Sequence, residues 1–501
     1  MTGNPVCKQT LAVLVSTVLL LLNSGCMVNK VTRPEVGKVP QPQQEHLVGV
    51  TTKKGDQVAF DRPGGIVREG TIQANVQQKP YNIALTDVER LWIERRGVSV
   101  VRTIGLSVGI AAAALGTLVA IAIALKQSCP FVYSWDGTQY VFDAEPYGGA
   151  ITKGLERDDY SELKHLREQN GLYRLMLTNE VDETQFTNLM ELWVVDRAPG
   201  TRVVADENGT LRGFTGIQSP GAAEDRYRRD LLPWLQATDR QVWEPDPVAG
   251  PDGELSQQVI LTFPKPEGAT QANLIANVAT GLWGSYMIKK MVELHGRETA
   301  NWLGSLDKDP ASIKSIHAWG EREGTYRLGI EVEEPGGWAQ RGTLPGGGPL
   351  LSEDRVISLD VSRVRGPRMR IRLRPPVGFW AFNSFAVAYG AGQAVSVQRV
   401  SAKSARTSGG RDILPLLKSA DDRYYPMPDT TDSAEIAFAA PRPKSGMERT
   451  VFLHSRGWYQ LHLRDHSDPD NATFGRIMTV PGAAVQFAAD RFKEWRHGTL
   501  R

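Results

Sequence analysis

The chain has 501 residues, too many for one hydrophobic core, so two to four domains are expected. Its 58 basic and 56 acidic residues leave a net charge of +2, which gives no argument for a nucleic-acid partner. The three cysteines, Cys7, Cys26 and Cys129, form no CxxC pair, which excludes a zinc ribbon and a redox pair, and they are too few for a disulfide framework.

The first 26 residues have the pattern of a secretory signal. Leu11–Leu22 is an apolar run that is too short to span a bilayer but suits the core of a signal peptide. Ser24 and Gly25 precede Cys26, and this ending resembles the lipobox of bacterial lipoproteins, with the usual leucine one position early. The resemblance implies a diacylated Cys26 and, because Met27 is not aspartate, an outer-membrane location. An ordinary signal peptide or an uncleaved anchor is the alternative.

The next two parts are a polar segment and a segment of alternating residues. Residues 27–45 are polar and contain three prolines, which predicts an extended linker. Within His46–Arg96 apolar and polar residues alternate between turn signals, which predicts five short strands. Five strands in about 50 residues indicate a small SH3-like β-barrel module, a kind that usually binds or packs rather than catalyses.

Thr103–Leu125 is the long apolar stretch of the chain. It carries no charge, and a helix of its length covers the roughly 30 Å hydrocarbon core of a bilayer. Gly105 and Gly109 would let a second helix approach closely, which favours a homo-oligomer. Basic residues before the stretch favour a cytoplasmic position for that flank, whereas the lipobox places it outside the cytoplasm. A buried Ala/Gly helix of a soluble domain is the alternative to a transmembrane or membrane-associated helix.

After Cys129 the sequence predicts mainly strands. Phe131–Trp135 and Gln139–Asp143 alternate and are joined by an Asp-Gly turn, which is a strong hairpin signal. Ala272–Leu294 carries apolar residues at four-residue steps and is predicted as a helix. Ser401–Arg411 is small and polar and is predicted as a flexible linker.

The expected fold class is therefore mainly β, of the α+β type. It combines the small β module, one hydrophobic helix and a large β-sandwich-like region with a few packed helices. Pro481 suits the first turn of a final helix that ends near Trp495. The predicted parts are a signal peptide (1–26), a linker (27–45), the β module (46–97), the hydrophobic helix (103–125), a first β-rich domain (129–270), a helical segment (271–305), a second β-rich region (306–400), a linker (401–412) and C-terminal strands with a helix (413–501).

Several long segments resemble one family of bacterial envelope lipoproteins. That family joins a short β module, an Ala/Gly-rich hydrophobic helix and a domain with the pattern CPFVYSWDG…YVFDAEPYGGA. The resemblance covers His46 to about Arg496 and implies architecture and an extracytoplasmic location, but no chemistry. The matching segments are Cys129–Gly137, Tyr140–Ala150, Asn179–Gln185, Asp230–Trp234, Leu282–Lys290, Leu344–Arg355 and Arg374–Gly390.

An acidic cluster follows the first hairpin. Its carboxylates could act as the acid and base of a glycosidase or could bind a divalent cation. Solvated loop carboxylates are the alternative. No calcium-loop, zinc-protease or serine-hydrolase pattern occurs, so no catalytic residue, metal site or cofactor is predicted. The candidate residues are Asp143, Glu145, Glu156 and Asp158, with Asp159 and Tyr160 beside them.

Four arginines alternate with apolar residues in a later segment. Period 2 places Met369, Ile371 and Leu373 on one face of a strand and the arginines on the other. Guanidinium groups could bind the phosphates of anionic lipid headgroups or an acidic partner. A solvent face neutralised by acids on a neighbouring strand is the alternative. The four candidate binding residues are Arg368, Arg370, Arg372 and Arg374.

Two further segments contain residue types that occur at metal or phosphate sites. His462–Asp470 combines imidazoles with carboxylates, but its alternation predicts a strand that ends in an Asp/Pro turn rather than a metal site. Pro345–Pro349 lacks the residues of a phosphate loop and is predicted as a wide turn.

Together these features predict a membrane-anchored lipoprotein of the bacterial cell envelope that acts as a non-enzymatic scaffold or binding module. Membrane lipid would be engaged through Cys26 and Thr103–Leu125, and most of the chain would lie in the periplasm or at the outer membrane. Envelope proteins or anionic lipid headgroups are the expected partners. The alternative is an enzyme that acts on envelope glycans through a carboxylate pair.

Overall fold

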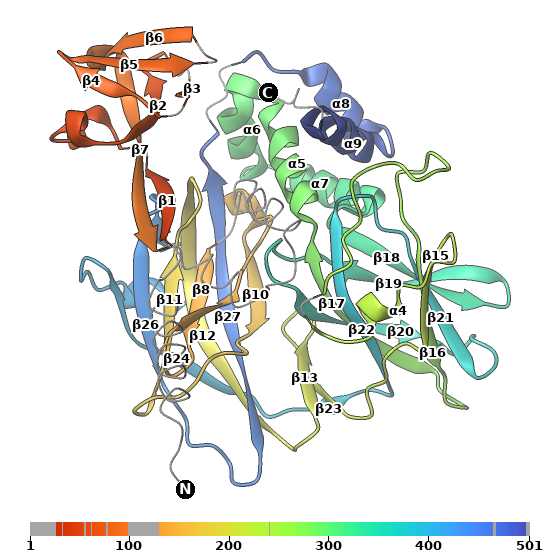
Figure 1. Ribbon diagram of the computed structural model, residues 1–501. Coiled ribbons are helices and arrows are strands. Elements are labelled where there is room, and N and C mark those ends of the chain that lie inside the picture. The colour runs from red at the N-terminus through yellow and green to blue at the C-terminus, as the bar shows by residue number, and fades with distance from the viewer. Residues whose placement is uncertain are drawn as a thin grey trace, which may run out of the picture. The chain divides into compact units, whose positions relative to one another are not determined.

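The computed structural model in Figure 1 describes residues 27–32, 34–54, 57–61, 63–76, 79–98, 130–239, 241–463 and 467–496. The chain divides into two compact units, Met1–Ala112 and Ala113–Arg501. The predicted signal peptide with Cys26, the apolar stretch Thr103–Leu125 and Cys129 lie outside the described residues. Within the described ranges, no helix is both long enough and apolar enough to cross a membrane.

The first unit contains two small sheets that share one core. Its strands are β1 (Met27–Thr32), β2 (Leu47–Thr52), β3 (Gln57–Ala59), β4 (Ile66–Arg68), β5 (Thr71–Val76), β6 (Lys79–Ala84) and β7 (Val88–Val98), with a short 3-10 helix η3 (Leu85–Asp87) before β7. One sheet has the order β1-β7-β2-β3 and the other the order β4-β5-β6. Leu47, Val50, Ile72 and Leu91 from both sheets meet in the core. The alternation in the sequence therefore reflects a small β module with one buried face per sheet.

Part of the predicted linker 27–45 belongs to this module, which corrects the expectation of an extended tether. β1 pairs antiparallel with β7 from Met27↔Val98 to Thr32↔Ile93. The short 3-10 helices η1 (Val36–Lys38) and η2 (Pro42–Gln44) follow, and Val39 is buried in the core. An edge strand is held by backbone hydrogen bonds and needs little apolar character, so the polar composition concealed it.

The second unit begins with a large sheet built from two distant parts of the chain. Its strands are β8 (Phe131–Trp135), β9 (Tyr140–Ala144), β10 (Arg157–Glu162), β11 (Leu172–Thr178), β12 (Glu183–Arg197), β24 (Gln398–Thr407), β25 (Tyr425–Met427), β26 (Ser433–Ala439) and β27 (Glu448–Leu461). The order is β10-β27-β12-β24-β26-β11-β8-β9, with β25 beside β12. The edge strands β9 and β10 approach each other, so the sheet is almost closed into a barrel and leaves a seam between them.

A second group of sheets lies beside the first (Figure 1). One sheet has the order β15-β16-β21-β18-β19, another β20-β17-β22, and a small one β13-β14-β23. The first two share a core that includes Leu261, Leu274, Ile371 and Phe382. The strands are β13 (Arg202–Ala205), β14 (Leu211–Phe214), β15 (Ala222–Asp225), β16 (Val259–Pro264), β17 (Gln271–Thr280), β18 (Arg327–Glu334), β19 (Gly337–Pro345), β20 (Glu353–Asp360), β21 (Arg368–Leu373), β22 (Trp380–Tyr389) and β23 (Gln393–Ala394).

Helices cover one end of this core. Trp283 and Met287 of α5 pack there with Ala488 and Phe492 of α9. A helix before the final one, α8, was not expected, and the Asp470 side chain caps it by accepting a hydrogen bond from Thr473 N. The helices are α4 (Leu232–Leu235), α5 (Leu282–Glu293), α6 (Thr299–Leu306), α7 (Pro310–Glu323), α8 (Asn471–Thr479) and α9 (Ala483–Arg496), with 3-10 helices η4 (Lys153–Leu155), η5 (Gly296–Glu298) and η6 (Leu414–Leu416).

Two of the expected elements are different in the structure. Ala272–Leu294 is not one helix, because Gln271–Thr280 forms strand β17 and α5 begins only at Leu282. β17 lies between β20 and β22 and is buried on both faces, so it shows no alternation, and a four-residue step suits a strand as well as a helix. Ser401–Arg411 is not a free linker, since most of it lies in β24 between β12 and β26.

The strands of 413–501 therefore complete the sheet that begins in 129–270, and these two predicted parts are one domain. The expected fold class, mainly β with a few packed helices, is confirmed.

Candidate functional site

Asp143 lies at the seam between β9 and β10 and is buried. Its carboxylate accepts hydrogen bonds from the backbone N–H groups of Lys164 (3.1 Å) and His165 (2.9 Å), and it lies 2.9 Å from His165 Nδ1. The hydrogen bond to Asp143 raises the pKa of His165. Asp143 is a residue of β9, and it therefore binds the segment that follows β10. This contact lies where the two edge strands do not pair with each other.

Glu145 joins the first sheet to the second group of sheets. It is buried, and its Oε2 accepts a hydrogen bond from Leu350 N at 2.9 Å. A Cβ at Gly348 would overlap the Glu145 carboxylate, so any other residue there would force that carboxylate to move. Thr280 Oγ1 donates to Gly347 O at 2.6 Å. The glycine-rich segment Pro345–Pro349, predicted as a wide turn, is thus packed against Glu145.

Glu156 and Asp158 share one guanidinium group. Arg456 Nη1 donates to Asp158 Oδ2 at 2.7 Å, and Arg456 Nη2 donates to Glu156 Oε2 at 3.2 Å. Asn188 Nδ2 also donates to Glu156 Oε1 at 3.1 Å. These two carboxylates therefore hold β10, β12 and β27 together rather than lying in solvated loops.

His454 bridges Asp158 and a carboxylate that the sequence did not single out, Glu191. Its Nε2 is 2.8 Å from Asp158 Oδ1 and its Nδ1 is 2.9 Å from Glu191 Oε1. The imidazole stacks on Tyr160 with a centroid distance of 4.7 Å. Burial opposes a charge on His454, but the hydrogen bonds to both carboxylates outweigh it and raise its pKa. The hydrogen bond from His454 in turn lowers the pKa of Asp158 and of Glu191.

Asp159 belongs to a separate buried polar group on the opposite face of β10. Its carboxylate accepts hydrogen bonds from Tyr147 N (2.9 Å) and Tyr160 N (2.8 Å). The ion pair between Glu353 and Arg355, 2.7 Å apart, lies nearby. Burial raises the pKa of Glu353 despite its arginine partner.

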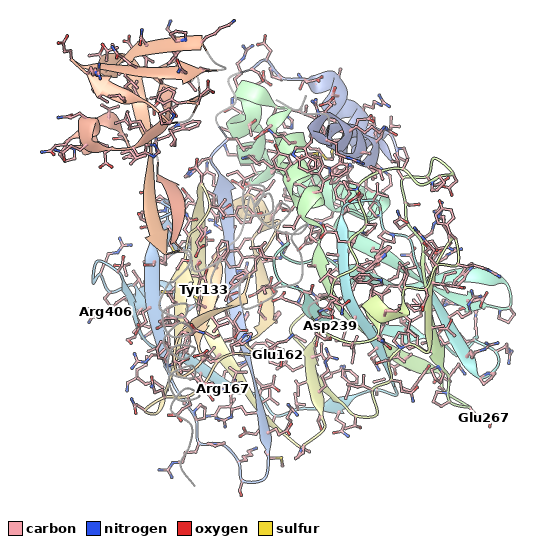
Figure 2. All side chains as sticks on the ribbon, viewed as in Figure 1. Tyr133, Glu162, Arg167, Asp239, Glu267 and Arg406 are labelled. Atoms are coloured by element: carbon pink, nitrogen blue, oxygen red, sulfur yellow. The ribbon has the colours of Figure 1, made fainter. Side chains whose placement is uncertain are left out.

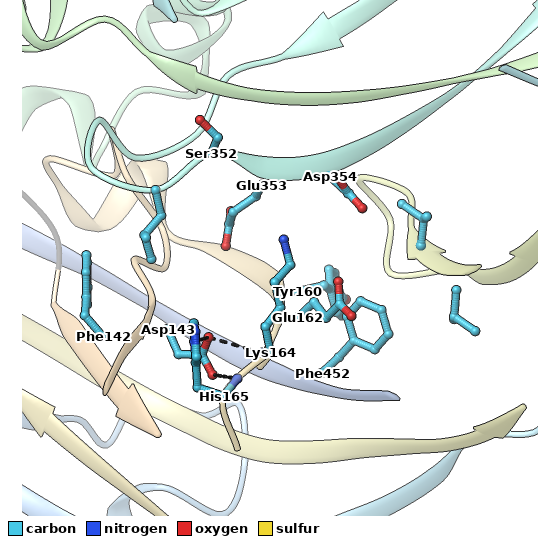
Figure 3. A pocket seen from close by; sticks show the side chains of 13 residues that line it. Phe142, Asp143, Tyr160, Glu162, Lys164, His165, Ser352, Glu353, Asp354 and Phe452 are labelled. Atoms are coloured by element: carbon cyan, nitrogen blue, oxygen red, sulfur yellow. Dashed lines mark hydrogen bonds and ion pairs between the residues drawn. The ribbon is translucent and has the colours of Figure 1, made fainter. Parts of the chain in front are cut away.

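A small pocket opens at the seam (Figure 3). Its volume is about 80 Å³, and Phe142, Tyr160 and Phe452 form part of its apolar wall. Figure 3 shows Lys164 reaching between Glu162 and Glu353 in this pocket. The carboxylates that line it are Asp143, Glu162, Glu353 and Asp354.

Glu162, Glu353 and Asp354 are pocket carboxylates that the sequence did not indicate, and Glu162 differs from the other two in its contacts. Burial raises its pKa, and it makes no ion pair or side-chain hydrogen bond with any residue that the structure describes. Asp354, by contrast, accepts hydrogen bonds from Arg202 Nε at 2.9 Å and Asn277 Nδ2 at 2.7 Å. In the sequence Glu162 is one polar position of a strand, and no local signal marks it. Of the four predicted carboxylates, only Asp143 lines this pocket.

The arginine segment 368–374 consists of β21 and the residue after it, and it has two neutralised and two exposed arginines. Arg370 Nη1 lies 2.9 Å from both carboxylate oxygens of Glu333, and Arg372 pairs bidentately with Glu331 at 2.7 and 2.9 Å. Both acids lie on the neighbouring strand β18, which is the alternative that the sequence left open. Both guanidinium groups also lie over Trp338, at 5.6 and 4.5 Å from its ring. The exposed residues, which make no ion pair with any described residue, are Arg368 and Arg374.

The predicted strand is β27, but it ends at Leu461, so His462 lies one residue beyond the strand rather than on it. His462 Nδ1 lies 2.9 Å from Asp182 Oδ1 and its Nε2 lies 2.8 Å from Thr184 Oγ1. His466 lies outside the described residues. In the ranges that the structure covers, no group of three or more His, Cys, Asp or Glu side chains could hold a metal ion.

The comparisons with known proteins give little guidance. No family model and no curated protein matches the chain. Among solved structures, a β-porphyranase of glycoside hydrolase family 86 from Bacteroides plebeius is similar over 47% of this chain and 37% of its own, with 7% identity and a TM-score of 0.16. An uncharacterised protein from Listeria monocytogenes, in complex with glucose, magnesium and calcium, is similar over 73% and 29%, with 10% identity and a TM-score of 0.17. A GH31 α-xylosidase from Xanthomonas citri is similar over 81% and 34%, with 8% identity and a TM-score of 0.13. The matched part is less than two-fifths of each of those chains, and TM-scores this low carry no functional argument.

Proposed function

We propose that this protein is a membrane-anchored lipoprotein of the bacterial cell envelope that acts as a non-enzymatic scaffold or binding module. The location rests on the lipobox-like ending at Cys26, on the apolar stretch Thr103–Leu125 and on the resemblance to envelope lipoproteins. The scaffold role rests on what the candidate carboxylates contact.

The observation that carries the proposal is the use of the four predicted carboxylates as structural acceptors. Asp143 accepts hydrogen bonds from two backbone N–H groups, and Glu145 accepts one from Leu350 N. Glu156 and Asp158 both accept hydrogen bonds from Arg456. A general acid or nucleophile must be free to reach a substrate. Carboxylates bound in this way suit a rigid frame that positions binding surfaces.

The location is tested with a C-terminal tag and protease added to spheroplasts, followed by fractionation of the membranes. Digestion of the tag in intact spheroplasts is expected, with the protein in the membrane fraction. Protection of the tag until lysis would place residues 130–501 in the cytoplasm and would overturn the proposal. The matching control is a cytoplasmic protein with the same tag, which must stay protected in the same sample.

The scaffold role is tested by changing Glu145 and Asp158 to amides and measuring envelope glycan turnover by the purified protein. A scaffold shows no turnover before or after the change. Turnover that the wild-type protein supports and a folded variant lacks would overturn the non-enzymatic role.

A second candidate function, an enzyme that acts on envelope glycans, is favoured by one observation. The seam pocket contains Glu162, a carboxyl group with a raised pKa and no described partner, beside Asp143 and Glu353. A general acid needs a raised pKa of this kind. Glu162→Gln would abolish glycan turnover if this function is right, whereas the exposed Glu168→Gln would leave it intact. Absence of turnover in the wild-type protein on peptidoglycan and on envelope polysaccharides would remove this candidate.

A further inference from the structure

One end of the five-stranded sheet is formed by two adjacent loops. Residues 265–270 join β16 to β17, and residues 361–367 join β20 to β21. Lys265 N donates to Pro367 O at 2.8 Å, and Val361 N donates to Thr270 O at 2.9 Å. The two loops are therefore held to each other by backbone hydrogen bonds and form a fixed part of the fold.

Four basic residues form what we call the cationic tip: Lys265, Arg363 and Arg365 on these loops, and Arg368 at the start of β21. The three arginines are exposed and Lys265 is half-buried. Val361 and Val364 are buried in the core, at 0% and 6% exposure. These valines anchor the loop, so the arginines between and after them point to solvent. No residue that the structure describes makes an ion pair or a side-chain hydrogen bond with any of the four.

Acidic groups near the cationic tip do not cancel its charge. Glu267 lies on the first loop and Asp360 ends β20 directly before the second loop, so the four positive groups have two negative groups near them. Asp360 already accepts a hydrogen bond from Ser362 N at 2.9 Å. Figure 2 shows Glu267 at an outer end of the second unit, far from the seam pocket that contains Glu162. The acids Glu331 and Glu333 are occupied by the neighbouring arginines of β21.

We propose that the cationic tip binds the phosphates of anionic phospholipid headgroups on a bilayer surface. The four cations lie on the two loops and at the start of β21, and none of them lines the seam pocket, so an extended anionic surface suits them better than a small molecule. Guanidinium groups bind phosphate bidentately, and each basic side chain near an anionic bilayer strengthens binding about fivefold. The inference rests on the proposed envelope location, because the predicted anchors would keep a bilayer within reach.

The test uses the full chain in nanodiscs of phosphatidylcholine, titrated with vesicles at low salt. One set of vesicles is pure phosphatidylcholine, and the other contains phosphatidylglycerol at one part in four. The wild-type chain is expected to prefer the anionic vesicles, with a preference that falls as salt is added. Replacing Arg363, Arg365 and Arg368 together by serine is expected to weaken binding to anionic vesicles about 100-fold. These side chains are exposed, so thermal unfolding should be unchanged.

Two matched variants make the result decisive. Replacing Lys308, Lys314 and Lys418 by serine removes the same number of exposed positive charges elsewhere and should change binding less than threefold. Glu267→Gln removes an acid from the cationic tip and should strengthen binding about fivefold. The inference is overturned if the lysine variant loses as much binding as the arginine variant. It is also overturned if the wild-type chain does not prefer anionic vesicles, which would leave an acidic protein as the partner.

The same experiments separate this inference from the proposed function. If the tag is accessible to protease but the wild-type chain does not prefer anionic vesicles, lipid binding by the cationic tip is refuted and the envelope location stands. A protected tag would refute the envelope location whatever the vesicles show.

Discussion

Replacing His454 tests the charge network of the first sheet most directly. The side chain is only 11% exposed, and its two nitrogens lie 2.8 Å from Asp158 and 2.9 Å from Glu191. When both carboxylates are ionised, both nitrogens must donate, so the bound form is the imidazolium. His454→Gln keeps a polar side chain but carries no charge and cannot donate to both acids.

The decrease in the free energy of unfolding that we expect for His454→Gln follows from these two hydrogen bonds. A hydrogen bond to a charged group contributes about 1.5–3 kcal/mol. The bond to Asp158 belongs at the low end, because that carboxylate is 34% exposed and keeps Arg456 as a partner. Glu191 is 16% exposed and keeps a hydrogen bond from Trp193 Nε1 at 2.7 Å. We therefore expect His454→Gln to lower the free energy of unfolding by about 3 kcal/mol near pH 6.

The pH dependence of this loss has a definite sign. The pKa of His454 is raised in the folded protein above its ordinary value, so its contribution is complete below about pH 6.5. The contribution disappears as the pH rises through the folded pKa. The pKa values of Asp158 and Glu191 are lowered, so their contribution disappears only as the pH falls below their ordinary range near 4. The difference between wild type and variant should therefore be largest between about pH 5 and 6.5 and shrink in alkali.

The measurement is chemical unfolding followed by tryptophan fluorescence at several pH values. His317→Gln is the control, because His317 is an exposed residue of α7. It should change stability by less than about 0.5 kcal/mol at every pH. A loss for His454→Gln below about 0.5 kcal/mol near pH 6, or a loss that grows with rising pH, would refute the imidazolium bridge.

Three further substitutions test other parts of the structure. Gly348→Ala should push the Glu145 carboxylate from Leu350 N and lower the free energy of unfolding by about 2 kcal/mol, measured by thermal unfolding, whereas Gly336→Ala, with open space beside it, should not. Arg372→Ala should lower stability by about 1 kcal/mol at low salt and less at high salt, and an effect independent of salt would contradict an ion pair with Glu331. Asp470→Ala removes the cap of α8 and should lower stability by about 1 kcal/mol, whereas Asp470→Asn should retain most of it.

Part of the candidate site could be predicted from the sequence because it depends on local pattern. The alternation of arginine with Met369, Ile371 and Leu373 places these three apolar residues on one face of β21, whichever strands lie beside it. All three are buried. The Asp-Gly turn after Trp135 likewise joins β8 and β9 as expected. In both cases a two-residue period or a turn signal spans only neighbouring residues.

Other features depended on which strands lie side by side, and no local pattern contains that information. The acids that neutralise Arg370 and Arg372 are on β18, about 40 residues away in the chain. The long strands β12 and β27 pair over their whole length, from Glu183↔Leu461 to Arg197↔Glu448, and bring His454 between two distant acids.

The sequence by itself determined that the chain is mainly β, where most strands lie and which residue types line their faces, because these follow from local periodicity and turn chemistry. Only the tertiary structure decided the roles of the charged residues. It brought Leu350 N to Glu145 and Arg456 to Asp158, made Gln271–Thr280 a doubly buried strand, and placed Glu162 in the seam pocket. A carboxylate acts according to the donors and the solvent around it, and here those neighbours come from segments that only the fold brings together.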